Sequence, residues 1–306
     1  MNVSIEAVEK RYGDVTALDG LSLEIPSGST FGLLGTNGAG KTTLFRLLVG
    51  HETPDAGRIT VGGIDVERAG ERVRERVGFL PDSVGFPARL TGREVLAFHA
   101  RMRGVPRSER DERIEDALTL VDMVEAAGRE VSGYSNGMRR RLGLASVLVG
   151  QPAVLVLDEP TAGLDPCGVA AFHDLVERVS AETDATIVFA SHALAEVERC
   201  CDRVAIVDDG RLVADGSVSD LRRASGGSVR VRIDAVDDAA RASIVDRASA
   251  VGSVSTTDAG VEVECESRDA THLVTGLDPA TVERIEIDDP GLGAVFLEAV
   301  GEEVSA

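Results

Sequence analysis

The sequence lacks tryptophan and has only two tyrosines and four cysteines among 306 residues. The cysteines form no Cys-x-x-Cys pair and two of them are adjacent, a spacing that favours neither a zinc site nor a disulfide framework and is typical of a reducing compartment. No run of about 18 uncharged apolar residues occurs, and the charged N-terminal segment is unlike a signal peptide. We therefore expect a cytoplasmic protein, with any membrane helices that it serves on another chain.

Basic residues are scarce relative to acidic ones: 32 lysines and arginines stand against 52 aspartates and glutamates, for a net charge of −20. Such a surface repels nucleic-acid phosphates, so a partner role for DNA or RNA is disfavoured. Lys10 and Lys41 are the only lysines. This composition resembles that of proteins from salt-loving (haloarchaeal) organisms, whose hydrated acidic surfaces tolerate molar salt. An ordinary acidic protein from a GC-rich genome is the alternative.

The hydrophobic patterns predict an α/β core. Residues 2–9 and 18–26 alternate apolar and polar side chains, which is typical of antiparallel strands with one solvated face. Runs at 30–34, 154–157 and 186–190 are continuously apolar, as in parallel strands that are buried on both faces. Helical patterns occupy residues 42–50, 107–125 and 135–149.

The length and a change in composition after residue 221 predict two domains. We expect the first at residues 1–222, with a helical subdomain at about 83–150, and the second at residues 228–306, with a hinge at Ser225-Gly-Gly-Ser228. The second region alternates strand and helix patterns, which is typical of a small α+β module of the split βαβ kind. Its strands are expected at 228–234, 261–266 and 281–288, and its helices at 237–250, 269–276 and 291–300.

The strongest chemical signal is Gly-Thr-Asn-Gly-Ala-Gly-Lys-Thr at residues 35–42, between an apolar strand and a helix. Such a glycine-rich loop turns its backbone N–H groups toward a phosphate chain, and the helix N-terminus adds a positive dipole end. Lys41 is then expected to reach the β- and γ-phosphates of a nucleotide such as ATP, and the Thr42 hydroxyl to bind Mg²⁺. A chance glycine-rich turn would not need this strand–loop–helix context. The predicted nucleotide-binding residues here are Gly35, Thr36, Asn37, Gly38, Ala39, Gly40, Lys41, Thr42 and Thr43.

A second apolar strand ends in Asp158 and Glu159. Asp158 is placed to hold Mg²⁺ through water, and Glu159 to polarise the attacking water as a general base. Alone, such a pair could be a solvated strand end. Downstream of a phosphate-binding loop, it predicts nucleotide hydrolysis.

Two further segments resemble the ABC transporter ATPase family: Tyr134-Ser-Asn-Gly-Met138 with its following helix, and Asp158-Glu-Pro-Thr-Ala-Gly-Leu-Asp-Pro166. The resemblance covers roughly residues 1–220 and implies a P-loop NTPase-type ABC cassette. It also implies a dimer, in which Ser135 and Gly137 of one protomer meet the γ-phosphate of the nucleotide held by the other.

The chain departs from the family pattern Leu-Ser-Gly-Gly-Gln at Tyr134, Asn136 and Met138. Asn136 can adopt a left-handed backbone, so the loop need not be broken. The departure bears on the substrate subfamily rather than on ATP binding.

The resemblance implies roles for four more residues. Tyr12 corresponds to the aromatic residue that stacks on adenine, His192 to the histidine that hydrogen-bonds the γ-phosphate, and Asp165 to the aspartate that communicates across the dimer. Asp82 stands where the family usually has a glutamine near Mg²⁺. It could supply an oxygen to the metal, although a carboxylate beside ATP is repelled unless the metal is present. Alone, Tyr12 and His192 could be ordinary surface or core residues.

Leu90-Thr-Gly-Arg-Glu94, the Tyr-Ser-x-Gly-Met variant and the ending at residues 292–298 resemble the group that pairs with ABC-2 type permeases. That likeness implies an ATPase subunit that powers export of a drug-like compound, an ion or a copper-related cargo. Its partners would be a separate permease and a second copy of itself or a homologous ATPase. It would lie on the inner face of the membrane through the permease, with residues 86–105 as a candidate docking surface.

The alternative is a soluble, non-transport ABC ATPase that acts on the ribosome or in DNA repair. Members of those groups carry two cassettes, a long coiled coil or zinc modules. This sequence has one cassette, no heptad insert and an acidic composition, which argue against that alternative.

Overall fold

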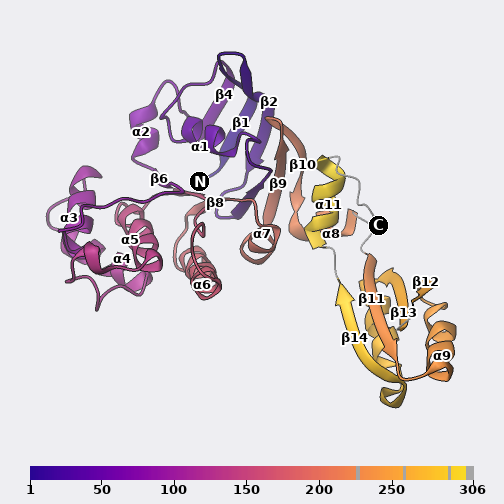
Figure 1. Cartoon of the computed structure of the whole chain (residues 1–306). Coiled ribbons are helices and arrows are strands. Elements are labelled where there is room, and N and C mark those ends of the chain that lie inside the picture. Colours follow the sequence, from indigo (N-terminus) through magenta and orange to yellow (C-terminus); the bar gives the residue numbers. More distant parts are fainter. Residues whose placement is uncertain (225–227, 258–259, 289–290, 301–306) are drawn as a thin grey trace. The chain divides into compact units, whose positions relative to one another are not determined.

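The computed structural model describes residues 1–224, 228–257, 260–288 and 291–300 (Figure 1). Two compact units make up the chain, Met1–Gly216 and Ser217–Ala306. Most of the expected hinge at Ser225–Ser228 lies outside the described residues. Within the described part, no helix combines the length and the apolar character that a membrane crossing needs.

An antiparallel sheet opens the first unit, as the alternating patterns predicted. The strand order is β2-β1-β4-β5. Val3, Ile5 and Val8 on β1 are buried while residues between them face outward, so one face of the sheet belongs to the core. The strands are β1 (Val3–Tyr12), β2 (Val15–Ile25), β4 (Ala56–Val61) and β5 (Ile64–Asp65).

A six-stranded sheet forms the centre of this unit, in the order β10-β9-β3-β8-β7-β6. Every residue of β3 and β7 is buried, which explains their continuously apolar sequences. The pairs that join β9, β3, β8, β7 and β6 are parallel, so the carboxyl ends of these strands meet at one edge. The strands are β3 (Thr30–Leu34), β6 (Val77–Leu80), β7 (Val154–Asp158), β8 (Thr186–Ser191), β9 (Arg203–Asp208) and β10 (Arg211–Ser217). The helices that connect them are α1 (Lys41–Leu48), α2 (Gly70–Arg74), α6 (Pro166–Glu182) and α7 (Leu194–Cys200).

A helical subdomain lies between β6 and β7 in the chain, as expected. It contains α3 (Gly92–Met102), α4 (Arg110–Leu120) and α5 (Asn136–Leu148), which contact one another (Figure 1). The second helix begins at Arg110, later than the 107–125 pattern predicts, and it ends at Leu120 because Asp122 has a left-handed backbone, with φ of 55°.

Tyr134, one of the departures from the family pattern, is buried in this subdomain. Its hydroxyl donates to the carbonyl of Ala126 at 2.7 Å. A Cβ atom on Gly92 would lie 2.5 Å from that hydroxyl oxygen, so the glycine makes room for the tyrosine. Tyr134, which departs from the family pattern, is thus accommodated by the absence of a side chain at Gly92.

The second unit contains an antiparallel sheet in the order β12-β13-β11-β14. Its βαββαβ sequence of elements agrees with the expected split βαβ module. The elements are β11 (Ser228–Ala235), α9 (Asp238–Ala248), β12 (Gly252–Thr256), β13 (Gly260–Glu266), α10 (Ser267–Thr275) and β14 (Val282–Asp288). The helices α8 (Val218–Ala224) and α11 (Gly291–Val300) contact each other, which groups α8 with this unit although the sequence placed it in the first domain.

Candidate active site

The phosphate-binding loop joins β3 to α1 at the carboxyl edge of the central sheet. Gly40 precedes α1 with φ of 101°, and a Cβ there would lie 2.5 Å from the Ala17 carbonyl oxygen, so only glycine fits. The N-terminus of α1 has no side-chain cap and no acidic residue in its first turn. Its free N–H groups and positive dipole end therefore suit an anionic phosphate.

Lys41 lies beneath this loop, with 7% of its surface exposed. Its ammonium donates to the carbonyls of Gly35 at 2.7 Å and Thr36 at 3.0 Å, and lies 4.0 Å from the Glu159 carboxylate. Burial lowers the pKa of Lys41, while the charges of Glu159 and Asp158 oppose that shift. The ammonium has a third N–H that a phosphate oxygen can accept.

Asp158 is 2% exposed at the end of β7. One of its carboxylate oxygens accepts from the Thr42 hydroxyl at 3.1 Å, and the other is buried without a hydrogen-bond partner among the described residues. Burial raises the pKa of Asp158, and the negative charges of Asp82 and Glu159 add to the rise, while the hydrogen bond from Thr42 opposes it. A hydroxyl beside an unpaired carboxylate oxygen is a set of hard ligands that fits Mg²⁺.

Glu159 follows directly and faces the loop after β8. Its carboxylate lies 2.8 Å from Nδ1 of His192. The backbone of Glu159 is left-handed, with φ of 42°, and its N–H donates to the carbonyl of Ala190 at 3.1 Å. A non-glycine residue in this region is strained and persists only where its surroundings hold it.

Arg140 is a site residue that sequence reasoning missed. It lies on α5 and is 5% exposed. Burial lowers the pKa of its guanidinium to about 10, although the carboxylates of Asp82, Asp158 and Glu159 oppose the shift, so it stays charged at neutral pH. The group donates to five backbone carbonyls, those of Pro81, Asp82, Asp158, Glu159 and Pro160.

Glu196 on α7 is a second missed residue. Its carboxylate accepts from the hydroxyls of Thr161 at 2.7 Å and Ser191 at 2.9 Å, and lies 3.9 Å from Nε2 of the buried His173. This cluster joins the loop that leads to Asp165 with the strand end that leads to His192. A glutamate in a short helix gives no sequence signal for such a contact.

Tyr12 lies near the first turn of α1. Its hydroxyl is hydrogen-bonded to Glu52, and the ammonium of Lys10 lies 5.6 Å from the centre of its ring. Burial raises the pKa of Tyr12 and the Glu52 hydrogen bond adds to the rise, while a hydrogen bond with Thr43 opposes it. Lys10 also donates to the carbonyl of Thr53 at 2.8 Å. Lys10 therefore links the Tyr12 ring to the segment that contains Thr53.

The remaining predicted residues lie on exposed helix starts and loops. Ser135 caps α5 by accepting from the N–H of Met138 at 3.2 Å, and Asp165 caps α6 by accepting from the N–H of Gly168 at 2.7 Å. A Cβ on Gly137 would meet only the Ser135 hydroxyl oxygen, at 3.9 Å. In the described part of the chain, none of these joins the cluster around Lys41, and their roles stay predictions.

Asp82 is exposed, and its carboxylate accepts from the N–H of Ser83 at 2.6 Å. Its charge nevertheless reaches Asp158, whose pKa it helps to raise. The structure thus brings Asp82 within electrostatic range of the carboxylate pair, and its role as a metal ligand stays a prediction.

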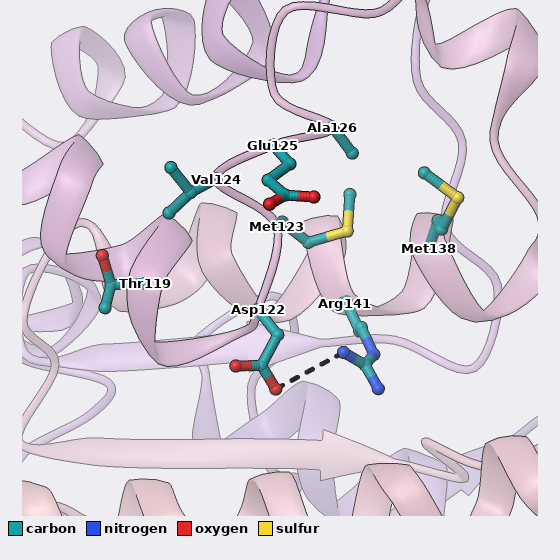
Figure 2. Close-up of a pocket in the computed structure, with 8 residues that line it drawn as sticks. All are labelled: Thr119, Asp122, Met123, Val124, Glu125, Ala126, Met138 and Arg141. Atoms are coloured by element: carbon teal, nitrogen blue, oxygen red, sulfur yellow. Dashed lines mark ion pairs between the residues drawn. The ribbon is translucent and has the colours of Figure 1, made fainter.

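A hollow of about 590 Å³ lies beside α5, away from the phosphate-binding loop. Figure 2 shows Met123 between Val124 and Met138, above the ion pair that Asp122 makes with Arg141 at 3.6 Å. No residue of the loop or of the carboxylate pair lines it. The hollow is therefore separate from the residues predicted to bind the nucleotide at the edge of the central sheet.

Residues 18–162 match the family model described as "ABC transporter". The chain is 42% identical over 234 residues to the daunorubicin resistance ATP-binding protein DrrA3 of Streptomyces coeruleorubidus, which covers 76% of this chain and 73% of that protein. It is 31% identical over 304 residues to the linearmycin resistance ATP-binding protein LnrL of Bacillus subtilis, which covers 97% of each chain, second unit included. Among solved structures it is similar to cbiO1 of Clostridium perfringens, part of the cbiONQ ABC transporter complex, with a TM-score of 0.65, 30% identity and coverage of 70% of this chain and 88% of that chain.

Proposed function

This chain belongs to the ABC transporter family and is an ATP-binding, ATP-hydrolysing member of it, and on that premise we propose that it powers a separate membrane permease that exports its cargo. One observation carries the proposal for the catalytic step. Lys41, the carboxylate of Asp158 and the Glu159–His192 pair meet at one edge of the sheet, at the N-terminus of α1.

In this proposal the loop N–H groups and Lys41 hold the phosphates of ATP, and Tyr12 supports the adenine. Thr42 and Asp158, with Asp82 nearby, hold Mg²⁺, which neutralises charge on the phosphate oxygens when bound. Glu159 accepts the proton of the attacking water, and His192 orients the Glu159 carboxylate through its Nδ1 contact.

We propose that two protomers, or one protomer and a homologous subunit, enclose ATP between them. The exposed start of α5 supports this arrangement, since Ser135 caps it and a Cβ on Gly137 would meet only the Ser135 hydroxyl, at 3.9 Å. A helix N-terminus that presents free N–H groups is a ready anion site for the partner's γ-phosphate. Dimer closure and opening would then follow ATP binding and hydrolysis, because the nucleotide binds the closed state more tightly.

The partner that receives this motion is proposed to be an ABC-2 type permease, with this chain peripheral on the inner face of the cell membrane. On α3, Phe98 and Met102 lie one turn apart and are 52% and 70% exposed, an apolar pair available for docking. Two relatives are named for resistance to daunorubicin and linearmycin. A transporter that confers resistance must carry the compound outward, which favours export of a drug-like molecule.

The catalytic proposal is tested with Glu159→Gln. We expect kcat for ATP to fall by at least about 100-fold, because the general base is lost while the fold is kept. ATP with Mg²⁺ should then hold the variant as a dimer in size-exclusion chromatography. Glu115→Gln, which removes an exposed carboxylate paired with Arg93, is the matched control and should keep normal turnover.

Two results would contradict the proposal. Normal ATP turnover by Glu159→Gln would remove Glu159 from the catalytic role. A variant that stayed monomeric with ATP and Mg²⁺, even with its permease present, would contradict the enclosed dimer.

A further inference from the structure

Arg140 uses every N–H of its guanidinium on backbone carbonyls, and those carbonyls come from two separate segments. The distances are 2.5 Å to Pro160, 2.6 Å to Pro81, 2.8 Å to Asp82, 3.0 Å to Asp158 and 2.8 Å to Glu159. One segment follows β6 and the other begins at the last residue of β7, so both lie at the carboxyl edge of the central sheet. The planar fork of an arginine has five donors, whereas a lysine ammonium has three.

The contact with Glu159 has a specific consequence for the general base. Glu159 has a left-handed backbone, with its N–H bound to Ala190 at 3.1 Å and its carbonyl bound to Arg140 at 2.8 Å. A strained residue keeps such a conformation only while both of its neighbours hold it. Arg140 therefore helps to hold the Glu159 backbone from which the carboxylate reaches Nδ1 of His192.

Arg140 is also fixed to the N-terminus of α5. The helix begins after its cap, Ser135, and five residues of helix span about 7.5 Å at about 1.5 Å per residue. A short, rigid helix of this length moves as one body, so a displacement at Ser135 reaches Arg140 directly.

We propose that Arg140 is a positioning residue that makes hydrolysis at Glu159 depend on the placement of α5. When the partner's nucleotide binds at Ser135 and Gly137, α5 shifts and Arg140 moves with it. Arg140 then changes the backbone position of Glu159 in the same protomer. The two nucleotide sites of the dimer are thereby coupled through five residues of helix. This inference rests on the dimer and on the general base proposed above.

A purely structural role is the competing explanation, and Arg103 provides the control for it. Its guanidinium also lies among backbone carbonyls, donating to Arg74 at 3.1 Å and to Val77 at 2.8 Å. Val77 begins β6, at the opposite end from Pro81. Arg103→Gln therefore breaks guanidinium hydrogen bonds to backbone carbonyls, two in number and less buried than those of Arg140, without touching the nucleotide edge.

The experiment compares Arg140→Gln, Arg140→Lys and Arg103→Gln in the full chain. For each we measure the melting temperature, the Kd of a fluorescent ATP analogue, and kcat and KM for ATP hydrolysis. We expect Arg140→Gln to lower kcat by about tenfold or more while KM and Kd change by less than about twofold, because only the placement of the base is lost. Arg140→Lys should recover part of kcat, and Arg103→Gln should lower the melting temperature with kcat nearly normal.

Coupling is tested by adding Ser135→Ala to each background. If α5 relays the signal, Ser135→Ala should lower kcat much less in the Arg140→Gln background than in the native chain. Should Arg140→Gln fail to fold, the same cycle is measured with Arg140→Lys.

Additive effects of Ser135→Ala and the Arg140 change, or an equal loss of kcat in Arg103→Gln, would overturn the inference. So would loss of ATP binding in Arg140→Gln. Normal turnover by Glu159→Gln is a different result, since it would remove the proposed general base whatever Arg140 does.

Discussion

The two units of the chain treat buried polar groups in opposite ways. The first buries Lys41, Arg140, Asp158 and His173 around the carboxyl edge of its central sheet. In the second unit, every buried residue that the structure describes is apolar or a glycine. Burying a charge lowers stability unless it is paired, so such groups persist where chemistry requires them. The contrast locates the chemistry in the first unit.

Arg232 of the second unit takes part in ion pairs that join neighbouring strands at the surface of its sheet. Arg232 on β11 lies 2.6 Å from Glu262 on β13 and 3.6 Å from Glu286 on β14. Exposed pairs of this kind contribute about 1 kcal/mol or less. The same residue types thus stabilise a surface in one unit and form a candidate reaction site in the other.

The contrast between the two units is tested most directly by replacing a lysine with arginine in the first unit and an arginine with lysine in the second. Lys41→Arg should lower ATP turnover by about 100-fold, because a planar guanidinium does not fit beneath the loop. Arg232→Lys in the second unit should leave turnover and melting temperature nearly unchanged. Steady-state ATPase assays and thermal melts of both variants check this, and a fully active Lys41→Arg would contradict the assignment of Lys41.

The independence of the two units is tested in the apolar core of the second. Ile233 is fully buried there, so Ile233→Ala should destabilise that unit by about 3 kcal/mol. ATP turnover should persist at temperatures where the second unit has unfolded. A separate early transition in calorimetry is the expected observation, and a single shifted transition with loss of turnover would show that the units unfold together.

A smaller effect is expected inside the helical subdomain. Gly92→Ala places a Cβ 2.5 Å from the Tyr134 hydroxyl and should cost about 1–3 kcal/mol through overpacking. Adding Tyr134→Phe should relieve part of that cost, because the clashing oxygen is gone. Urea unfolding of the two single variants and the double variant measures the coupling, and strictly additive effects would argue against the contact.

The smallest effect concerns salt. The net charge of −20 should make the free energy of unfolding rise between 0.1 M and 2 M KCl, because salt screens the self-repulsion of the acidic surface. We propose on this ground that the protein is adapted to high salt. Urea midpoints in KCl and in NaCl should rise together, and a flat or falling midpoint would favour the ordinary acidic protein instead.

The parts of the site that the sequence predicted are contiguous in the chain. The strand, the phosphate-binding loop and α1 follow one another over residues 30–48, so local pattern and spacing suffice. The Asp158–Glu159 pair was similarly visible as the end of an apolar run. The strand β12 was missed because Gly252–Thr256 contains a single apolar residue and depends on pairing with β13.

Arg140 shows why other parts could not be predicted. Arg139, Arg140 and Arg141 are consecutive and identical in type, yet the first bonds Asn136, the second is buried among carbonyls, and the third pairs with Asp122. Their different surroundings come from segments that are distant in sequence. Local periodicity carries no information about such contacts.

The fit of Tyr134 against Gly92 also has an evolutionary consequence. A lineage with a smaller residue at position 134 is free to exchange the glycine at position 92 for a residue with a side chain. After such a change, tyrosine at position 134 would clash with the side chain at position 92 until glycine is restored there. The order in which these two substitutions occur therefore matters, and among relatives tyrosine at the one position should occur together with glycine at the other.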